Sequence, residues 1–248
     1  MVNQEPKVKV RSLTKKFGDL LVLDNLNFEV DAGEFLCIVG PTGCGKTTFL
    51  NSLTRLYEPT AGDILVNGIP VDPKKQNISY IFQEYSSFPW QTVEQNIRFG
   101  LEIKKVPKEE ADANVEEMLD IVGLTKFRNY YPSQLSISML QRVAIARAFA
   151  TKPELLLMDE PYGQLDIDLR FKLEDELIRL WKKTGTTVLF ITHNIEEAVY
   201  LSQKIMVLTN KPTSVKTVLD NPLPMPRDVV SPEFVELRNQ VTDLIKWW

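Results

Sequence analysis

The segment GPTGCGKT, at residues 40–47, constrains the fold of this chain more than any other stretch of its sequence. It fits the pattern GxxxxGKT of a phosphate-binding loop, or P-loop, in which glycines let the backbone approach a phosphate closely. The nearly continuous apolar run GEFLCIVG comes before it, and TTFLNSLTRL follows with helical spacing of Phe49, Leu53 and Leu56. A buried strand, this loop and a helix together form a nest of backbone N–H groups for anions. The alternative is a chance match in a glycine-containing turn.

The P-loop predicts that the chain binds ATP with Mg²⁺. We expect Lys46 to reach the β- and γ-phosphates, which also makes it a candidate catalytic residue, and Thr47 to offer its hydroxyl to the metal ion. The predicted nucleotide ligands in this segment are Gly40, Pro41, Thr42, Gly43, Cys44, Gly45, Lys46, Thr47 and Thr48.

A second chemical signal stands at the end of the apolar run LLLMDE, which covers residues 155–160. A buried strand there would deliver Asp159 to the Mg²⁺ ion and Glu160 to the side of the γ-phosphate. We expect Glu160 to orient and deprotonate the attacking water as a general base. An exposed pair of carboxylates at a strand end is the alternative, but the P-loop upstream favours the catalytic interpretation.

His193 is the only histidine of the chain, and it ends the next buried run, TTVLFITH. The carboxyl ends of parallel strands meet at one edge of a sheet, where ligands bind. A lone histidine usually has a structural role. At the end of a strand beside an ATP site, a contact with the γ-phosphate is the better prediction.

The remaining sequence predicts an α/β fold with additions. KVKVRSLTKKFG and LLVLDNLNFEV are typical of strands around a turn at Gly18 and Asp19, and GDILVNGIPV is typical of a hairpin that turns at Asn67 and Gly68. Residues 93–150 are mainly helical in pattern, with the last of these helices expected over MLQRVAIARAFA. After it, the helix LRFKLEDELIRLWKKTG separates the two buried strands.

These elements predict a single domain over residues 1–248 with three parts. About 1–87 and 151–215 would form the nucleotide-binding core, about 88–150 a helical subdomain, and about 216–248 a connector and a final helix. Ser231 is the expected N-cap of that helix. One face of it carries Phe234, Leu237, Val241, Leu244 and Trp248, which would pack on the host domain or, alternatively, on another subunit.

Composition excludes several other classes of protein. The chain of 248 residues has 44% hydrophobic and 25% charged residues, as soluble globular proteins do. Its net charge of −4 argues against a nucleic-acid-binding surface, which usually needs a basic face. Cys37 and Cys44 belong to no Cys/His cluster, so we expect neither a zinc site nor a disulfide framework. No apolar run approaches the ~18 residues of a membrane span, so another chain would do any membrane crossing.

Together, these motifs resemble those of the nucleotide-binding subunit of an ATP-binding-cassette (ABC) transporter, over about residues 7–245. The resemblance implies the ABC ATPase fold, a P-loop NTPase core with an N-terminal antiparallel β subdomain and an inserted α-helical subdomain. It also implies that Phe17 stacks on adenine, that Gln83 senses Mg²⁺ and the γ-phosphate, that Asp166 bridges two subunits and that His193 is the switch histidine. The first three have ordinary alternatives, namely a strand or turn aromatic, a solvated loop amide and a helix cap.

The family carries a signature loop, LSGGQ or LSGGM, where this chain has Leu135, Ser136, Ile137, Ser138 and Met139. The resemblance implies that this loop contacts the γ-phosphate held by the P-loop of a second subunit, in a head-to-tail dimer. Ser136 and Ser138 are the predicted contacts, together with backbone N–H groups and the positive end of the following helix.

Both signature glycines are replaced, and Leu140 stands where the family usually has glutamine. If the side chain of Ile137 points at the nucleotide, overpacking costs about 1–3 kcal/mol and weakens dimer closure roughly 5- to 150-fold. If the side chain points away, the effect is small.

The resemblance is closest to the importer ATPases for nitrate, sulfonates, taurine and related small solutes, on segments such as FQEYSSFPWQTVEQNI and RDVVSPEFVELR. It implies a peripheral ATP-hydrolysing subunit at the cytoplasmic face of the cell membrane. The implied partners are two integral-membrane permease subunits, an extracytoplasmic solute-binding protein and a second ATPase subunit, identical or different. Tyr85, Phe88 and Trp90 are candidates for a permease-docking groove, or else pack within the helical subdomain.

Two other functions stay open. The first is a regulatory ATP-binding subunit with a degenerate signature, which pairs with a different, intact ATPase subunit. The second is a soluble ABC ATPase that acts on DNA, ribosomes or protein complexes. Such proteins usually carry two cassettes, long coiled coils or basic linkers, which this sequence lacks, so no nucleic-acid partner is expected.

Overall fold

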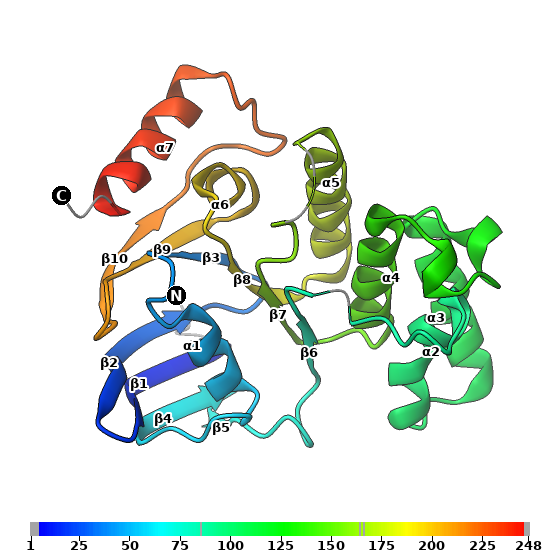
Figure 1. The fold of residues 1–248 in the computed structure, drawn as a ribbon, viewed down its shortest axis with the longest axis horizontal. Helices are drawn as coiled ribbons and strands as arrows, with labels where there is room; N and C mark the ends of the chain where they lie inside the picture. Colours follow the sequence, from blue (N-terminus) through cyan, green and yellow to red (C-terminus); the bar gives the residue numbers. More distant parts are fainter. Residues whose placement is uncertain (1–4, 85, 164, 166, 246–248) are drawn as a thin grey trace. The chain divides into compact units, whose positions relative to one another are not determined.

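The computed structural model describes residues 5–84, 86–163, 165 and 167–245 (Figure 1). The chain forms two compact units. The first joins the residues up to Gln76 with those from Thr187 onward, and the second is Asn77–Thr186. Each unit contains both strands and helices, as an α/β chain should. The division predicted from the sequence, into a core, a helical subdomain and a C-terminal connector, stays a prediction.

An antiparallel sheet in the first unit contains both predicted hairpins. Its strands are β1 (Val8–Phe17), β2 (Leu20–Val30), β4 (Ala61–Val66) and β5 (Ile69–Pro70). β1 pairs with β2 and with β4, and β4 pairs with β5. Asn67 and Gly68 turn the second hairpin with φ angles of 54° and 74°, as a two-residue type I′ turn requires.

Four further strands of the first unit pair in the order β10 (Val215–Asp220), β9 (Lys204–Leu208), β3 (Phe35–Val39) and β8 (Thr187–Ile191). β3 runs parallel to β9 and β8, whereas β10 is antiparallel to β9. Every residue of β3 and β8 is buried. Their continuous apolar runs are therefore those of strands covered on both faces, as predicted.

The helix after the P-loop, α1 (Lys46–Leu53), is shorter than its sequence pattern predicts. Phe49 and Leu53 are fully buried, but Leu56 is 62% exposed. Arg55 has a φ angle of 58°, a left-handed conformation that takes the chain out of the helical path. The assignment of Leu56 to the apolar face of this helix is therefore wrong.

The second unit is mainly helical around one parallel pair of strands, β6 (Ile78–Ile81) and β7 (Leu155–Asp159). Its helices are α2 (Val93–Ile103), α3 (Lys108–Ile121), α4 (Ile137–Ala150) and α5 (Ile167–Thr184), with single 3₁₀ turns at Thr125–Phe127 and Pro132–Gln134. α2, α3 and α4 pack against one another. The prediction of a mainly helical stretch over residues 93–150 is confirmed.

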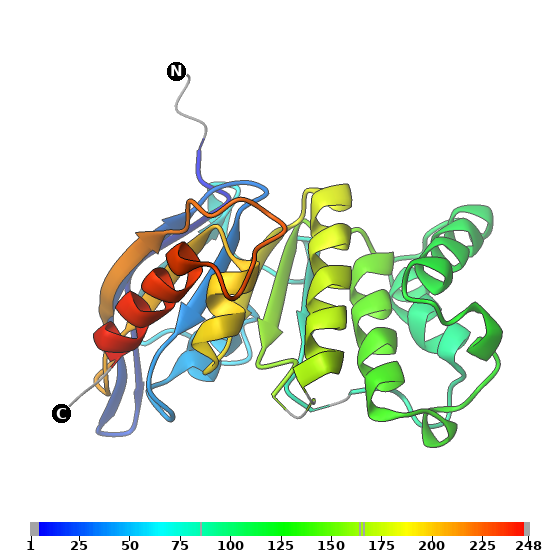
Figure 2. The ribbon, with the colours of Figure 1, turned by 90° about the horizontal axis from the view of Figure 1, so that it is seen from above.

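The C-terminal helix α7 (Pro232–Ile245) packs on its own unit. It lies beside the short helix α6 (Ile195–Leu201) in both views of the ribbon (Figures 1 and 2). Ser231 caps α7, because its Oγ accepts a hydrogen bond of 3.3 Å from the N–H of Phe234. Phe234, Leu237 and Val241 are buried, which favours the packing interpretation of the apolar face, while Trp248 lies outside the described residues.

Within the described ranges, no helix combines the length and the apolarity needed to cross a bilayer.

Candidate nucleotide-binding site

The P-loop connects the end of β3 to the start of α1 in the first unit. Lys46, the first residue of α1, is buried, and its ammonium donates hydrogen bonds to the carbonyl oxygens of Gly40 (3.0 Å) and Pro41 (3.2 Å). Thr47 is exposed at the helix start, where backbone N–H groups lack intrahelical partners. A cation, a hydroxyl and a helix N-terminus thus lie together, an arrangement that binds phosphate.

Gly45 is the most crowded glycine of the P-loop. Its φ angle is 124°, a conformation that residues with a Cβ rarely adopt. A Cβ added to Gly45 would lie 2.9 Å from Cγ1 of Val22 and 3.2 Å from Cδ2 of Leu23, both on β2. Gly43 has a φ angle of 75°, but a Cβ there would meet no heavy atom within 4 Å. Gly43 is therefore needed for the turn alone, and Gly45 for the turn and for close packing.

Thr213 supports the P-loop from the segment between β9 and β10, a role that no sequence pattern predicts. It is fully buried, and its hydroxyl donates a hydrogen bond to the carbonyl oxygen of Cys44. Its backbone N–H donates to the carbonyl oxygen of Val22 (2.9 Å), and its carbonyl oxygen accepts from the N–H of Asp24 (2.8 Å). Thr213 therefore ties the P-loop to β2.

Phe17, the predicted adenine-stacking residue, belongs to an aromatic pair in the first unit. Its ring meets that of Tyr57 edge to face, with ring centroids 5.3 Å apart and an interplanar angle of 87°. Nζ of Lys15 lies 4.9 Å from the centroid of the Phe17 ring. Phe17 is 42% exposed, so part of the ring stays accessible to a stacking partner. Tyr57 was not among the predicted residues.

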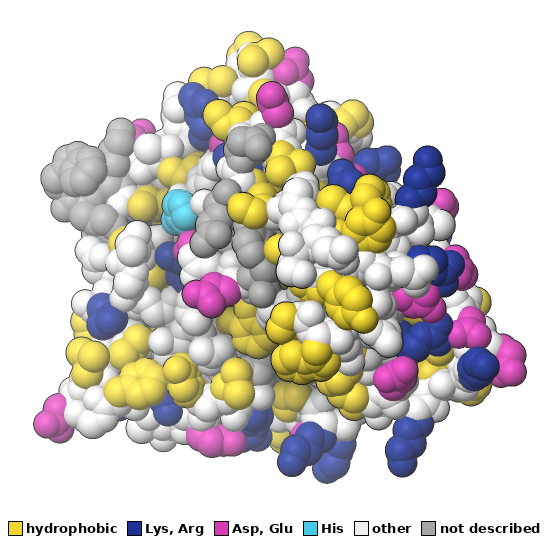
Figure 3. Space-filling view, turned by 45° about the vertical axis from the view of Figure 1, so that its right-hand side comes forward, with side chains coloured by type: hydrophobic (Ala, Val, Ile, Leu, Met, Phe, Trp, Pro, Cys, Tyr) yellow, Lys and Arg dark blue, Asp and Glu magenta, His cyan; other side chains and the backbone are white. Residues whose placement is uncertain are grey.

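His193 lies at the P-loop edge of the parallel strands. β8 is paired with β3 so that Ile191 stands opposite Ile38, and the N–H of Thr192 donates to the carbonyl oxygen of Ile38 at 3.2 Å. His193 therefore follows β8 at the edge where the P-loop follows β3. Its side chain is exposed and is the one coloured cyan in Figure 3. The structure brings it to the P-loop edge, while its γ-phosphate contact stays a prediction.

In the second unit, the two predicted carboxylates lie at the end of β7. Asp159 is the last residue of the strand and is 4% exposed, and the hydroxyl of Tyr80 donates to its Oδ2 at 3.3 Å. Glu160 follows with a φ angle of 46°, in the left-handed region that a residue with a long side chain adopts only under strain. The N–H of Gly163 donates to the carbonyl oxygen of Glu160 at 3.3 Å and helps to hold this conformation.

Gln83 lies beside Glu160, because both follow neighbouring parallel strands. β6 and β7 are paired with Ile81 opposite Met158, so the residues after them emerge at the same edge. The amide nitrogen of Gln83 lies 3.5 Å from Oε2 of Glu160, at the outer limit of a hydrogen bond. The second unit therefore brings together the carboxylate that is predicted to activate water and the amide that is predicted to sense the γ-phosphate.

The segment LSISM is the beginning of α4 rather than a loop before it. Ser136 is the N-cap, and its Oγ accepts a hydrogen bond of 3.4 Å from the N–H of Met139. The hydroxyl oxygens of Ser136 and Ser138 lie 2.9 Å apart. Ile137, the first residue of the helix, is 50% exposed, so its side chain is not part of the core. The expected helix start at Met139 is thus too late, because the Ser136 cap begins the helix earlier.

Comparison with known proteins decides the family. The family described as ABC transporter matches residues 23–163, which run from β2 through the P-loop and the segment LSISM to just beyond Glu160. The chain belongs to the ABC transporter family.

Relatives of known name agree with this assignment. The ABC chain is 44% identical over 244 residues to an uncharacterized ABC transporter ATP-binding protein of Methanocaldococcus jannaschii, covering 97% of this chain and 91% of that protein. It is 41% identical over 229 residues to an aliphatic sulfonates import ATP-binding protein of Bacillus cereus, covering 92% and 90% of the two chains.

Solved ABC structures share the fold. The cbiO1 protein of Clostridium perfringens, part of an ABC transporter complex, superposes with a TM-score of 0.80 at 25% identity, covering 88% of this chain and 89% of that one. A dimeric ATP-binding cassette in a post-hydrolysis state, bound to ADP and Pi, superposes with a TM-score of 0.76 at 32% identity. The match covers 86% of this chain and 98% of that one. The predicted ABC ATPase fold is confirmed, and the chain is an ATP-binding ATPase subunit whose hydrolysis drives transport.

Two predicted residues of the ABC site, Asp166 and Tyr85, lie outside the described residues. Of the other docking candidates, Trp90 is 71% exposed, whereas Phe88 is half-buried with its ring centroid 4.5 Å from that of Phe99. Phe88 therefore anchors the segment, and Trp90 projects from it.

The P-loop cysteine of this ABC ATPase should react slowly with alkylating reagents. Cys44 is 2% exposed, and burial raises the pKa of its thiol above the ordinary value, so the thiolate is scarce at neutral pH. We expect iodoacetamide to modify Cys44 more than ~10-fold faster in the denatured chain than in the native one at pH 7.5, with a native rate that rises with pH. Peptide mass spectrometry separates it from Cys37, and equal native and denatured rates would contradict the burial of the thiol.

Proposed function

We propose that the chain is the ATP-hydrolysing subunit of an ABC importer for a small solute of the nitrate, sulfonate and taurine class. Its 41% identity to a protein named for the import of aliphatic sulfonates, over 92% of the chain, carries the proposal. The chain retains Lys46, Asp159, Glu160 and His193, which supports a subunit that hydrolyses ATP rather than one that only binds it.

In this proposal each nucleotide-site residue has one role. The P-loop backbone from Gly40 to Thr48 and the ammonium of Lys46 bind the phosphates. Phe17 stacks on adenine. Glu160 takes a proton from the attacking water, and His193 contacts the γ-phosphate. Asp166 and Ser136 act across the interface with a second ATPase subunit.

Mg²⁺ fits the donors that the chain offers. Thr47 has an exposed hydroxyl, Gln83 an amide oxygen, and Asp159 a carboxylate held by Tyr80. Hard oxygen donors of these kinds are the ligands that Mg²⁺ prefers. When bound, the ion would neutralise negative charge on the β- and γ-phosphates.

The partners follow from the same proposal. Two permease subunits would cross the membrane, a solute-binding protein would deliver the solute from outside, and this chain would lie at the cytoplasmic face. The segment that carries Phe88 and Trp90 would receive a short helix of a permease subunit. ATP binding would close the ATPase dimer and shift the permease between its two states, and hydrolysis would reset it.

A second candidate function rests on the segment LSISM, residues 135–139. Ser136 remains as N-cap of α4, but Ile137 and Ser138 replace both glycines. A regulatory subunit that binds ATP and pairs with a different, intact ATPase would tolerate this loss. The exposure of Ile137 and the proximity of the Ser136 and Ser138 hydroxyls favour a signature that still contacts phosphate, though less strongly.

Reconstitution tests the importer function. The chain is placed in lipid vesicles with its permease subunits, and ATP hydrolysis is measured with the solute-binding protein loaded in turn with ethanesulfonate, taurine and nitrate. We expect one solute to accelerate hydrolysis and to accumulate on the side of the membrane that carries the ATPase subunit and ATP. A rate of ATP hydrolysis that none of the three solutes changes would contradict the proposed solute class.

Restoring the signature glycines should strengthen dimer closure. The double replacement Ile137→Gly and Ser138→Gly removes two side chains from the expected interface. We therefore expect the dissociation constant of the MgATP-dependent dimer to fall roughly 5- to 150-fold. The dimer dissociation constant is measured by analytical ultracentrifugation, with Val230→Gly, at another highly exposed apolar residue, as control. An unchanged dissociation constant would show that Ile137 points away from the nucleotide.

A further inference from the structure

The segment of residues 86–91, called here the docking segment, is fixed to α2 by one buried amide. Oδ1 of Asn96 accepts the N–H of Phe88 at 2.8 Å, and Nδ2 of Asn96 donates to the carbonyl oxygens of Phe88 (3.2 Å) and Gln91 (3.1 Å). Asn96 is fully buried. One buried side chain therefore ties the docking segment to the N-terminal half of α2.

The first turn of α2 is also hydrogen-bonded to the segment of residues 128–136, called here the signature segment. The N–H of Val93 donates to the carbonyl oxygen of Tyr130 at 2.9 Å, and the N–H of Glu94 donates to that of Arg128 at 3.0 Å. These are two of the N–H groups that a helix leaves without internal partners. The signature segment ends at Ser136, the cap of α4.

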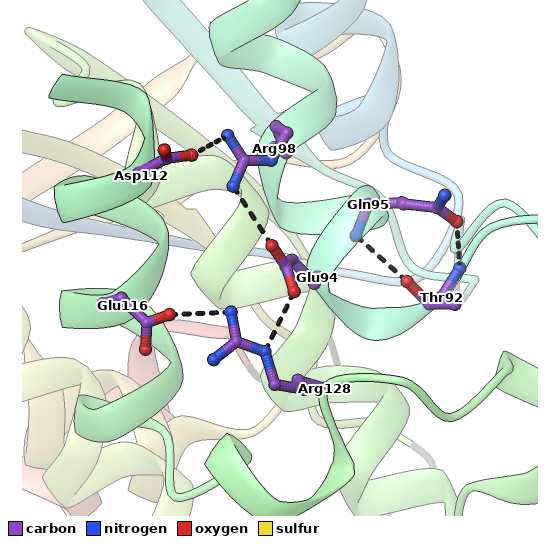
Figure 4. Close-up of polar contacts among 7 residues, drawn as sticks. All are labelled: Thr92, Glu94, Gln95, Arg98, Asp112, Glu116 and Arg128. Atoms are coloured by element: carbon purple, nitrogen blue, oxygen red, sulfur yellow. Dashed lines mark hydrogen bonds and ion pairs between the residues drawn. The ribbon is translucent and has the colours of Figure 1, made fainter. Parts of the chain in front are cut away.

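The side chain of Glu94 strengthens this connection (Figure 4). Its two oxygens accept from Nε of Arg128 at 2.9 Å and from Nη2 of Arg98 at 3.1 Å. Arg128 also pairs with Glu116 (2.7 Å) and Arg98 with Asp112 (2.6 Å), both on α3. The hydrogen bond from Arg128 holds the pKa of Glu94 below its usual value, so the carboxylate is charged at neutral pH.

We propose that Glu94 is a positioning residue that makes the docking segment and the signature segment move together. It stands on the first turn of α2, close to the contacts of that helix with both segments, and it joins an arginine of the signature segment to an arginine of α2 itself. The inference rests on the proposed function, which assigns permease contact to the first segment and nucleotide contact to the second. Displacement of a permease helix would thereby also displace the signature segment.

A merely structural role predicts something different. The same helix end carries a capping box, in which Thr92 Oγ1 accepts the N–H of Gln95 at 3.3 Å and Gln95 Oε1 accepts the N–H of Thr92 at 2.9 Å. Replacement of Thr92 by Ala weakens this end of α2 without touching the Glu94 ion pairs (Figure 4). If Glu94 only stabilises α2, Glu94→Gln and Thr92→Ala should behave alike.

Hydrogen exchange read by mass spectrometry separates the two roles. All variants carry Glu160→Gln to retain ATP, and exchange is followed with and without MgATP over residues 86–91, 128–136 and 40–48. In the parent protein we expect MgATP to slow exchange in both the docking and the signature segments. In Glu94→Gln the signature segment should still respond, while the response of the docking segment falls by about 2- to 30-fold. In Thr92→Ala both segments should respond together.

Two results would overturn the inference. One is a docking segment that responds to MgATP equally in the parent and in Glu94→Gln. The other is a parent protein in which MgATP slows exchange in the P-loop but leaves the signature segment unchanged. Failure of the proposed function itself gives a third pattern, in which MgATP leaves residues 40–48 unchanged in every variant, and it removes the basis of the inference as well.

Discussion

Replacement of Glu160 by Gln should slow ATP turnover by ~10²–10⁴-fold, the usual effect of losing a general base. The change keeps the size of the side chain and its distance to Gln83, but it removes the carboxylate that would accept a proton from water. Glu160 also occupies a strained position directly after β7, with a φ angle of 46°. Strain of this kind persists where a side chain must be aimed away from the path of a regular strand. ATP affinity should change little.

Release of inorganic phosphate from MgATP by the purified chain measures this effect. Glu154→Gln is a matched control, because Glu154 comes directly before β7 as Glu160 comes directly after it. The Oε1 of Glu154 accepts the N–H of Asn77 at 3.0 Å, which a glutamine oxygen can also do. Full turnover in the Glu160 variant would show that another group activates the water.

Replacement of Gly45 by Ala should abolish ATP binding and destabilise the fold. A residue with a Cβ at a φ angle of 124° is strained by about 1–3 kcal/mol. The added methyl would lie 2.9 Å from Cγ1 of Val22, and overpacking of this kind costs about 1–3 kcal/mol more. The sum is a large part of the ~5–15 kcal/mol that stabilises a typical domain. The P-loop and β2 must separate to relieve the contact, which distorts the anion nest.

Gly43→Ala is the matched control for this prediction. Gly43 has a φ angle of 75° and open space around an added Cβ, so only the conformational strain applies. We expect urea denaturation to show a smaller loss in the free energy of unfolding for Gly43→Ala than for Gly45→Ala. Equal losses in the two variants would mean that the contact with Val22 is unimportant.

Local sequence patterns predict the elements that are marked by residues adjacent in the chain, such as apolar runs and turn residues. β3 and β8 are unbroken apolar runs, and the turn of the β4–β5 hairpin needs positive φ angles that Asn67 and Gly68 supply. β6, β9, β10 and α6 were not predicted. The sequence of β10, VKTVLD, does not alternate apolar with polar residues, and α6 has only 7 residues, too few to show a helical period.

The candidate site could be predicted where a short sequence motif indicates the function of its residues, as the P-loop and the Asp159–Glu160 pair do. The supporting partners were not. Thr213 and Tyr57 reach the site from distant parts of the chain, and Tyr80 joins Asp159 only because β6 pairs with β7. Such contacts depend on the tertiary fold and leave no local pattern in the sequence. α4 begins earlier than its apolar pattern predicts, because the N-cap at Ser136 starts the helix at Ile137.

We expect this ATPase, with LSISM in place of the signature glycines, still to close around ATP. Light scattering on the Glu160→Gln protein, with and without MgATP, measures this closure. A monomer without nucleotide and a dimer with MgATP are the expected states, because Ser136 and the N-terminus of α4 remain available for phosphate. If the protein binds MgATP and yet stays monomeric at every concentration, its signature does not close the dimer, and the regulatory subunit that needs a different partner is favoured.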